Sequence, residues 1–395
     1  MGYVNPYLAV DGPQFAEAQR LGHLALQIDG DTPYAVDFGE FDAGVVDFTS
    51  GSACEWFAEE IIGKHMLDFG LSGWMADFGE YLPTDLRLHD GSDPMRAHNR
   101  WPVLWAKVNA DAIAARGKTG DALFFMRAGF SGSQRHCALL WAGDQSVDFS
   151  RHDGIGTVIT AALSAGLVGN PYSHHDVGGY TSLHGNVRTN DLMMRWIELG
   201  AFTPVMRSHE GNRPDDNLQI DSTPEILAHF AAMSRVHAAL APYVRSLCDV
   251  AVATGLPLQR PLFLHFPDDP HCHEIFDQYL YGEDMLIAPI VTENAHDRMV
   301  YLPETTGRQD FSCRTEAASH WVIHPHSSAL QARRPLLARG QSAIRRSFCR
   351  SCNTPRAGGM SERVYRDVWQ GRCVGENHQP GINRLLCLAI DPRKG

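Results

Sequence analysis

The chain has 395 residues, 44% of them hydrophobic, which is enough to bury one or two full cores and excludes a small disulfide-stapled domain. Its formal net charge of −12 argues against a general nucleic-acid binder, because such a protein needs a basic face. The start, MGYVNPYLAV, has no charged leader before an apolar run, and no uncharged apolar stretch of about 18 residues follows, so we expect neither a signal peptide nor a membrane span.

Up to about residue 303, short apolar strands alternate with turns and amphipathic helices. In chain order the pattern first predicts strands at 2–7 and 45–48, a helix at 53–67 capped by Ser52, a strand at 74–78, a helix at 102–116 with a proline near its start, and a strand at 122–127. It then predicts a strand at 139–142, a helix at 155–168, a strand end near Val177, a helix at 191–199, a strand at 202–207, and one or two helices in 224–252.

This alternation predicts an α/β fold with parallel strands, either an open doubly wound sheet or a closed eight-stranded barrel. No GxGxxG turn opens a helix, which weakens the dinucleotide-binding version. Active sites of barrels are assembled at the carboxyl ends of several strands. We therefore favour a barrel, because several predicted strands end in charged or imidazole side chains: Asp77, Arg127, Asp144, Asp176 and His209.

The composition changes along the last third of the chain. Residues 261–266, 285–291 and 299–302 are predicted strands of a small C-terminal β appendix, which gives a barrel domain at 1–255 and an appendix at 256–304. Residues 307–395 hold 14 Arg and one Lys against six acidic residues, with no sustained period. We expect this tail, 305–395, to be poorly folded. The nine cysteines form no regular framework, which is typical of reduced thiols in a cytoplasmic protein.

Two of the strand-end side chains are carboxylates in the same context, Asp77 in GWMADFGE and Asp144 in LLWAGDQ. A turn or cap aspartate is the structural alternative for each. Retaining glycoside hydrolysis needs such a pair, because one carboxylate attacks the anomeric carbon while the other, about 5 Å away, protonates the leaving oxygen. The acid needs a raised pKa, which an aromatic wall such as Trp141 would supply by desolvation.

The motifs GWMADFGEYLPTD, FFMRAG, LLWAGDQ, HHDVGGYTSL and MRSHEGNRP resemble those of family-31 glycoside hydrolases. Within that family they are most similar to the sulfoquinovosidases, which cleave α-linked 6-deoxy-6-sulfoglucose from sulfolipid glycerides. The resemblance covers about residues 2 to 303. It implies a (β/α)8 TIM barrel and a retaining double displacement, in which Asp77 matches the nucleophile and Asp144 the acid/base. Two carboxylates and water suffice for this chemistry, so no cofactor is implied.

The resemblance also implies a set of substrate-binding residues. Arg127 and His209 match residues that hydrogen-bond the sugar hydroxyls, and Asp176 matches a carboxylate of the same pocket. Tyr180 matches a tyrosine at the sulfonate end of the site. Trp141 is a candidate floor for the sugar, and Glu80 fits the nucleophile motif without an assigned role.

Structural alternatives stay open for these residues. Arg127 would serve equally in an ion pair with a barrel carboxylate such as Asp77. His209 is otherwise a satisfied core histidine, and Tyr180 and Trp141 are otherwise packed aromatic rings.

Two clusters contain residue types that commonly bind metal ions, but their spacing matches no known metal-binding motif. His174, His175 and Asp176 with His184 contain no HExxH pattern, and the Cys349–Cys352 pair lacks a second pair at a suitable distance. We therefore predict no metal site.

The chain departs from the family pattern at both ends. It starts at what corresponds to the third barrel strand, so we expect an N-terminally truncated barrel that lacks its first strands. The Gln, Arg and Trp that grip the sulfonate in the family lie upstream of this point. The matching pattern stops near residue 304, as a shifted reading frame would produce.

The sequence therefore predicts a retaining α-glycoside hydrolase that acts on α-sulfoquinovosides. Its expected partner is a small glycoside substrate, with no nucleic acid and no membrane, and the oligomeric state is not indicated. The alternatives are a family-31 α-glucosidase or α-xylosidase, a catalytically dead sugar-binding remnant, and a non-functional fragment.

Overall fold

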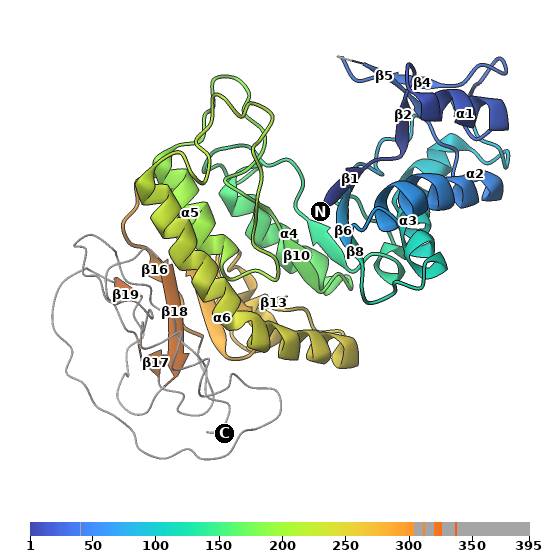
Figure 1. The fold of residues 1–395 in the computed structure, drawn as a ribbon. Coiled ribbons are helices and arrows are strands. Elements are labelled where there is room, and N and C mark those ends of the chain that lie inside the picture. The colour runs from blue at the N-terminus through green and yellow to red at the C-terminus, as the bar shows by residue number, and fades with distance from the viewer. Residues whose placement is uncertain (40, 304–310, 313–319, 326–335, 338–395) are drawn as a thin grey trace. The chain divides into compact units, whose positions relative to one another are not determined.

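The computed structural model describes residues 1–39, 41–303, 311–312, 320–325 and 336–337 of the chain (Figure 1). The chain divides into two compact units, Met1–Trp141 and Ala142–Gly395, and each is described by itself. No helix in the described ranges is long and apolar enough to cross a membrane. Apart from three short strands, the predicted tail at 305–395, with Cys349 and Cys352, lies outside the described residues.

The centre of the first unit is a short parallel sheet. Strands β1 (Gly2–Val4), β6 (Gly73–Ala76) and β8 (Leu123–Phe125) pair in the order β1-β6-β8. The register joins Val4 to Ala76 and Trp74 to Phe124, so the carboxyl ends of the strands lie at one edge. The predicted parallel strands at 2–7, 74–78 and 122–127 are confirmed, although each is shorter than predicted.

Helices bury their apolar faces in the core of this unit. Helix α2 (Gly51–Trp56) continues into the π-helix η1 (Phe57–Leu67), and α3 (Pro94–Ala115) contacts η1. Within α3, Trp101 and Trp105 are fully buried, and both rings lie against Phe48 at centroid distances of 5.6 and 5.5 Å. The aromatic residues thus account for much of the core beside the sheet.

Two predicted helix starts in this unit are wrong, one by two residues and the other by eight. Ser50, not Ser52, caps α2, because its Oγ accepts a hydrogen bond from the amide of Ala53. Helix α3 begins at Pro94, so Pro102 lies inside it rather than near its start. Asp93 caps this helix by accepting from the amide of Met95 at 3.0 Å.

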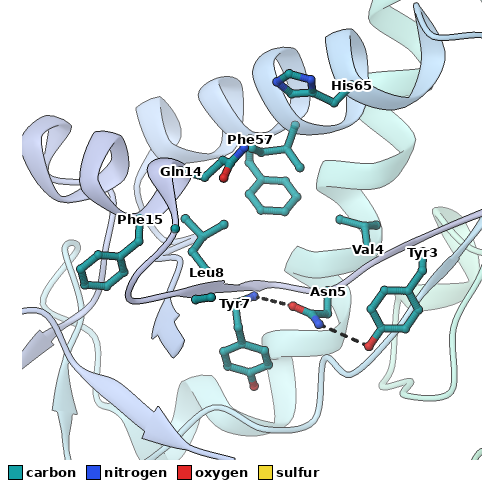
Figure 2. Close-up of a pocket in the computed structure, with 12 residues that line it drawn as sticks. Tyr3, Val4, Asn5, Tyr7, Leu8, Gln14, Phe15, Phe57 and His65 are labelled. Carbon is teal, nitrogen blue, oxygen red and sulfur yellow. Dashed lines mark hydrogen bonds between the residues drawn. The ribbon is translucent and has the colours of Figure 1, made fainter. Parts of the chain in front are cut away.

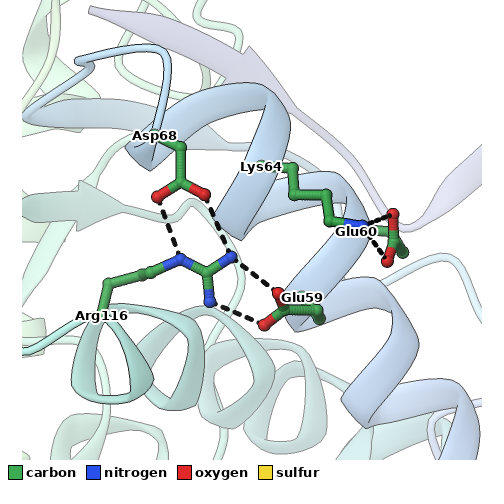
Figure 3. Close-up of polar contacts among 5 residues, drawn as sticks. All are labelled: Glu59, Glu60, Lys64, Asp68 and Arg116. Atoms are coloured by element: carbon green, nitrogen blue, oxygen red, sulfur yellow. Dashed lines mark hydrogen bonds and ion pairs between the residues drawn. The ribbon is translucent and has the colours of Figure 1, made fainter.

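Ion pairs at the surface join the end of α3 to η1 (Figure 3). Arg116 donates to both carboxylate oxygens of Glu59, at 2.6 and 2.9 Å, and its Nε donates to Asp68 at 3.0 Å. A Cβ atom at Gly63 would lie only 2.5 Å from the Arg116 guanidinium. The glycine therefore lets the arginine lie directly against the π-helix.

Smaller elements complete the first unit. Helix α1 (Pro13–Leu21) has only nine residues and buries only Ala18, and the sequence analysis did not predict it. The other elements are short: β2 (Tyr7–Ala9), β5 (Asp42–Val45) and β4 (Ala35–Asp37) in an antiparallel sheet, β3 (Leu26–Gln27) with β7 (Leu86–Arg87), the 3-10 turn η2 (Ser133–Arg135), and β9 (Leu139–Trp141).

The second unit contains three long helices and several short strands. The helices are α4 (Ile155–Leu167), α5 (Asn190–Gly200) and α6 (Pro224–Thr254), and the strands before α6 are β10 (Tyr172–His174), β11 (Asp176–Val177) and β12 (Arg207–Ser208). Helix α6 packs against the shorter α5 over part of its length (Figure 1). It is one continuous helix, although Pro242 lies inside it.

The end of the second unit is an antiparallel sheet. Its strands pair in the order β13 (Gln259–Arg260), β14 (Tyr279–Tyr281), β15 (Met285–Pro289), β18 (His320–Pro325) and β17 (Phe311–Ser312). A further pair joins β16 (Met299–Val300) to β19 (Leu336–Leu337), and 3-10 turns occur at η3 (Leu262–Leu264) and η4 (Pro270–His273). Three strands of the predicted tail therefore pair with strands of this region or with one another.

Two strand predictions in this unit need correction. Residues 261–266 form the turn η3 rather than a strand, and Pro261 at its start has no amide hydrogen for a strand ladder. The strand predicted at 202–207 is reduced to β12, because 201–204 form turns that end α5. Each apolar run is buried at its first two residues and half-buried after them.

Candidate active site

Asp77 follows the last residue of β6 and still bonds to the neighbouring strand, since its amide donates to the carbonyl of Val4 at 2.9 Å. The chain then turns sharply through two left-handed residues, Phe78 at φ +58° and Gly79 at φ +101°. A non-glycine residue in this region is strained, and such strain is common at functional sites. A Cβ at Gly79 would lie 3.0 Å from Trp105, so the turn packs tightly on α3.

Two hydrogen-bond donors and one cation converge on the Asp77 carboxylate. The hydroxyl of Tyr3 donates to Oδ2 at 2.7 Å, and the amide of Phe78 donates to Oδ1 at 2.7 Å. The guanidinium of Arg127 lies 3.4 Å from Oδ1. Since the residue is only 8% exposed, these contacts fix the orientation of the carboxylate at the strand end.

Trp105 supports the backbone of the same residue. Its indole Nε1 donates to the carbonyl oxygen of Asp77 at 3.1 Å, and the ring is fully buried. Sequence reasoning missed both Tyr3 and Trp105. Tyr3 carries no motif signal, whereas the position of Trp105 on a helix gave no hint that its N–H meets the strand end.

Arg127 and Glu80 form an ion pair beside this carboxylate. Arg127 Nε and Nη2 lie 2.8 and 2.7 Å from Glu80 Oε1, and its Cζ lies 4.5 Å from the centroid of the Phe78 ring. The ion pair that was the structural alternative for Arg127 is therefore present. Its predicted contact with the sugar stays a prediction. The ion pair also gives Glu80 a contact in the site: it neutralises the arginine that borders Asp77.

A cavity of about 310 Å³ lies in the same unit, between β1, β2 and η1 (Figure 2). Tyr3 lies at its edge, where the Asn5 amide donates to the Tyr3 hydroxyl at 3.3 Å and the amide of Tyr7 donates to Asn5 at 3.1 Å. Its other walls are mainly apolar, including Val4 and Phe57. None of the eight predicted site residues lines it, so it is not the predicted sugar pocket.

Trp141 is 2% exposed and lies edge-on to Phe125, with ring centroids 5.5 Å apart and an interplanar angle of 88°. This burial is typical of a packed core residue. Its indole N–H has no hydrogen-bond partner in the described part of the chain. The ring therefore contributes mainly to the core, and its predicted contact with a sugar stays a prediction.

Asp144 belongs to the second unit and lies on an exposed turn after Gly143, which has φ +85°. The backbone of this turn is held by a second loop. Thr181 Oγ1 donates to the carbonyl of Asp144 at 2.7 Å, and the amides of Tyr180 and Thr181 donate to the carbonyl of Gln145 at 2.8 and 2.9 Å. The predicted acid/base and the predicted sulfonate-end tyrosine are therefore carried by two loops that are hydrogen-bonded to each other.

Asp176 is buried in the same unit and forms an ion pair with Arg207. The parallel register of β11 and β12 places these two residues directly opposite each other. Burial raises the pKa of the Asp176 carboxyl, Arg207 and His209 oppose this shift, and the charge of Asp144 adds to it. The charges of Asp144 and His209 are therefore among those that act on this buried carboxyl.

Tyr180 and His209 meet edge to face, with ring centroids 4.9 Å apart and an interplanar angle of 87°. The imidazole Nδ1 accepts the amide hydrogen of Gly211 at 3.1 Å, which leaves Nε2 as the outer nitrogen. Both side chains are half-buried. The second unit thus brings four predicted residues together: Asp144, Asp176, Tyr180 and His209.

The other four predicted residues, Asp77, Glu80, Arg127 and Trp141, belong to the first unit. Among the described residues no group of three or more His, Cys, Asp or Glu is arranged to hold a metal ion. The four described cysteines, Cys54, Cys137, Cys248 and Cys272, are free thiols.

Comparison with known proteins identifies the family. The model of the glycosyl hydrolases family 31 TIM-barrel domain matches residues 1–247, and the model of the family 31 C-terminal domain matches residues 255–344. The chain belongs to glycosyl hydrolase family 31. The second match extends past residue 304 and includes strands β17, β18 and β19.

Two curated family-31 relatives are both named sulfoquinovosidase. The one from Agrobacterium fabrum is 64% identical over 303 residues, which cover 77% of this chain and 46% of the relative. The one from Escherichia coli is 49% identical over 304 residues, which cover 77% and 44%. A family-31 sulfoquinovosidase from E. rectale, solved in complex with the aza-sugar inhibitor IFGSQ, is 51% identical with a TM-score of 0.75 and covers 78% of this chain and 46% of that one. The chain thus spans about half the length of these relatives.

Proposed function

We propose that this family-31 chain carries the catalytic carboxylates of a retaining α-glycosidase that hydrolyses α-sulfoquinovosides. The observation that carries the proposal is the Asp77 carboxylate, which two hydrogen-bond donors and the Arg127 cation orient at the carboxyl end of a parallel strand, just before a strained turn. The sulfoquinovosidase relatives support the substrate class, because they share 64% and 49% of the aligned residues.

In the proposed mechanism, a carboxylate oxygen of Asp77 attacks the anomeric carbon while the glycosidic C–O bond breaks. Asp144 gives its proton to the leaving oxygen. In the second step Asp144 takes a proton from water, whose oxygen displaces Asp77 from the glycosyl ester and restores both carboxyl groups. Asp144 suits this exchange with solvent because it is an exposed residue on a fixed turn.

The remaining side chains are proposed to bind the sugar. Arg127 and His209 carry N–H donors for ring hydroxyls, and Asp176 accepts hydroxyl hydrogens from the sugar. Tyr180 is proposed to face the sulfonate, Trp141 to floor the sugar, and Glu80 to hold Arg127 in place. The support for the last role is the 2.7 Å contact between Glu80 and Arg127.

We also propose a domain division close to the one predicted from the sequence, with the barrel domain up to about residue 255 and the β-rich appendix after it. The boundary between the two family models, at 247 and 255, supports this division. The cysteine usage supports a cytoplasmic protein.

The test is release of 4-nitrophenol from 4-nitrophenyl α-sulfoquinovoside by the purified chain, beside the matching α-glucoside and α-xyloside. We expect turnover of the sulfoquinovoside alone, loss of turnover in Asp77→Asn and Asp144→Asn, and the α-anomer as the first sugar product in proton NMR spectra. Preference for either of the other glycosides would assign a different family-31 activity. Binding by calorimetry without release would identify a sugar-binding remnant.

A further inference from the structure

Arg188 is a buried arginine that takes part in none of the ion pairs formed by the described residues. The residue as a whole is only 2% exposed to solvent. The guanidinium donates instead to two backbone carbonyls, from Nη2 to Gly179 at 2.7 Å and from Nη1 to Leu218 at 3.1 Å. The charge of Asp176 favours the charged form of Arg188, but the hydrogen bonds of the guanidinium go to peptide carbonyls. Burying a cation without a hydrogen-bonded carboxylate costs stability, which points to a role of the arginine beyond the stability of the fold.

The guanidinium lies between two glycines, both in the left-handed region. A Cβ at Gly178 (φ +98°) would lie 2.9 Å from Cδ and Nε of Arg188, and a Cβ at Gly211 (φ +91°) would lie 3.0 Å from its Nη2. Neither position therefore accepts a side chain while the arginine stays in place. The arginine joins two motifs that are about 30 residues apart, GGY and SHEGN.

Each of these glycines is next to a predicted substrate-binding residue. Gly178 and Gly179 lead directly into Tyr180, and the amide of Gly211 donates to Nδ1 of His209 at 3.1 Å. The same Cβ at Gly211 would also lie 2.9 Å from the carbonyl of Tyr180. The position of Arg188 thus bears on both rings of the Tyr180–His209 pair, whose centroids are 4.9 Å apart.

The backbone of Arg188 is itself fixed. Its amide donates to Oδ1 of Asn217 at 2.8 Å, and Asn217 is buried and donates onward to the carbonyl of Arg213 at 2.7 Å. Burial lowers the pKa of Arg188 to about 10, so the guanidinium is still charged and donating at neutral pH.

We propose that Arg188 is a positioning residue that sets the mutual arrangement of Tyr180 and His209 and thereby the recognition of the sugar. The part concerning the sugar rests on the proposed function, whereas the arrangement of the two rings does not. Arg188 acts through the loops it joins and touches no substrate.

The first test reads the ring pair without any substrate. Selective ¹³C labelling of histidine gives an Hε1 signal for each ring, and the His209 signal is assigned by its loss in His209→Asn. Tyr180→Leu measures the shift that the tyrosine ring causes. We expect Arg188→Met and Arg188→Lys to move the His209 signal toward its position in Tyr180→Leu, with the lysine variant intermediate because it reaches a single carbonyl.

Arg195→Met is the matched control, since Arg195 is also buried in the second unit but pairs with Asp191 and Glu198. We expect it to lower the melting temperature without moving the His209 signal. A His209 signal that stays at its wild-type position in both folded Arg188 variants would overturn the proposal.

A second test displaces the arginine from the opposite side, for use if the Arg188 variants fail to fold. Gly178→Ala introduces a Cβ that meets Cδ and Nε of Arg188, and we expect it to move the His209 signal. Gly255→Ala, at φ +78° with open space around the added Cβ, controls for the strain of the left-handed backbone. Equal His209 shifts in both alanine variants would also overturn the proposal.

Kinetics supply the link to the sugar. With 4-nitrophenyl α-sulfoquinovoside we expect Arg188→Lys to raise KM about tenfold, the effect of one weakened hydrogen bond, with a smaller change in kcat. An unchanged KM beside a moved His209 signal would refute the recognition step alone. Absence of turnover in the unmodified chain would count against the proposed function, and the NMR result would still decide the positioning role.

Discussion

Tyr3 and Asp77 are 74 positions apart in the chain, and the Tyr3 hydroxyl donates to Oδ2 of Asp77 at 2.7 Å. Burial, and then the negative charge of Asp77, raises the pKa of Tyr3 above its usual value. The hydroxyl therefore stays protonated over the whole range in which a glycosidase works. A residue at the start of the chain thus directly orients the proposed nucleophile.

Replacement of Tyr3 by Phe tests this contact. We expect Tyr3→Phe to lower kcat/KM for the sulfoquinovoside by about 10- to 100-fold, because a hydrogen bond to a charged group is lost. Tyr34→Phe is the control, since Tyr34 makes the same 2.7 Å contact with Asp85 at an exposed site. Equal kcat/KM values in the two variants would show that Tyr3 does not assist Asp77.

Two tryptophans in one helix separate support of Asp77 from core packing. Trp105 and Trp101 are both fully buried in α3 against Phe48, but only Trp105 donates to the Asp77 carbonyl, while the Trp101 N–H has no partner in the described chain. We expect Trp105→Phe and Trp101→Phe each to cost about 1–3 kcal/mol of unfolding free energy in urea. Only Trp105→Phe should also lower kcat, and a comparable loss in Trp101→Phe would contradict the support role.

The surface ion pairs of Figure 3 give a salt-dependent prediction. We expect Arg116→Met to lower the melting temperature more than Lys64→Met, because Arg116 joins α3 to two carboxylates of the η1 region whereas Lys64 pairs only with Glu60 one turn away. Added salt should reduce the difference, since exposed ion pairs are screened. Equal melting temperatures at low salt would argue against Arg116 as a link.

His175 predicts a loss of stability at mildly acidic pH. It is 3% exposed, and burial, then the charge of Arg207, lowers its pKa to about 3. Its Nδ1 accepts from Trp196 Nε1 at 2.9 Å, as a neutral ring must. Between pH 6.5 and about pH 3, the His175 ring is protonated in the unfolded chain but stays neutral in the folded protein. The free energy of unfolding therefore decreases as the pH falls through this range.

The measurement is urea unfolding of the chain and of His175→Gln at pH 7.5 and pH 5.5. Each pH unit well below the ordinary pKa contributes about 1.4 kcal/mol, so the wild type should lose about 1 kcal/mol more than the variant over this interval. The other titrating groups, including Asp176, are common to both proteins. Parallel losses in the two proteins would show that His175 is not the cause.

Much of the first unit could be predicted because its apolar strands are short and end in charged side chains. The strands ending near Asp77 and Arg127 were found from this pattern alone, and their parallel pairing is confirmed. The residues at which these strands end could not be predicted from the sequence. Phe78 is typical of a strand, but it adopts φ +58°, and the strand ends before it. Helix α1 was not predicted, since it buries a single alanine.

The residues that hold the site together were harder to find than the residues that form it. Motifs identified Asp77, Asp144, Asp176 and His209, because carboxylates and imidazoles at strand ends are unusual in packing. Trp105 and Arg188 act through the backbone, from a helix face and from a loop. A side chain whose partner is a peptide carbonyl leaves no pattern in the sequence, since every residue offers that partner.

The close packing of Arg188 between Gly178 and Gly211 has an evolutionary consequence. Both glycines also have positive φ, and a Cβ at Gly211 would meet the Tyr180 carbonyl, so homologues should keep glycine at both positions even where the arginine is replaced. An alanine at position 178, whose Cβ would meet Arg188 itself, should occur only beside a shorter residue at position 188.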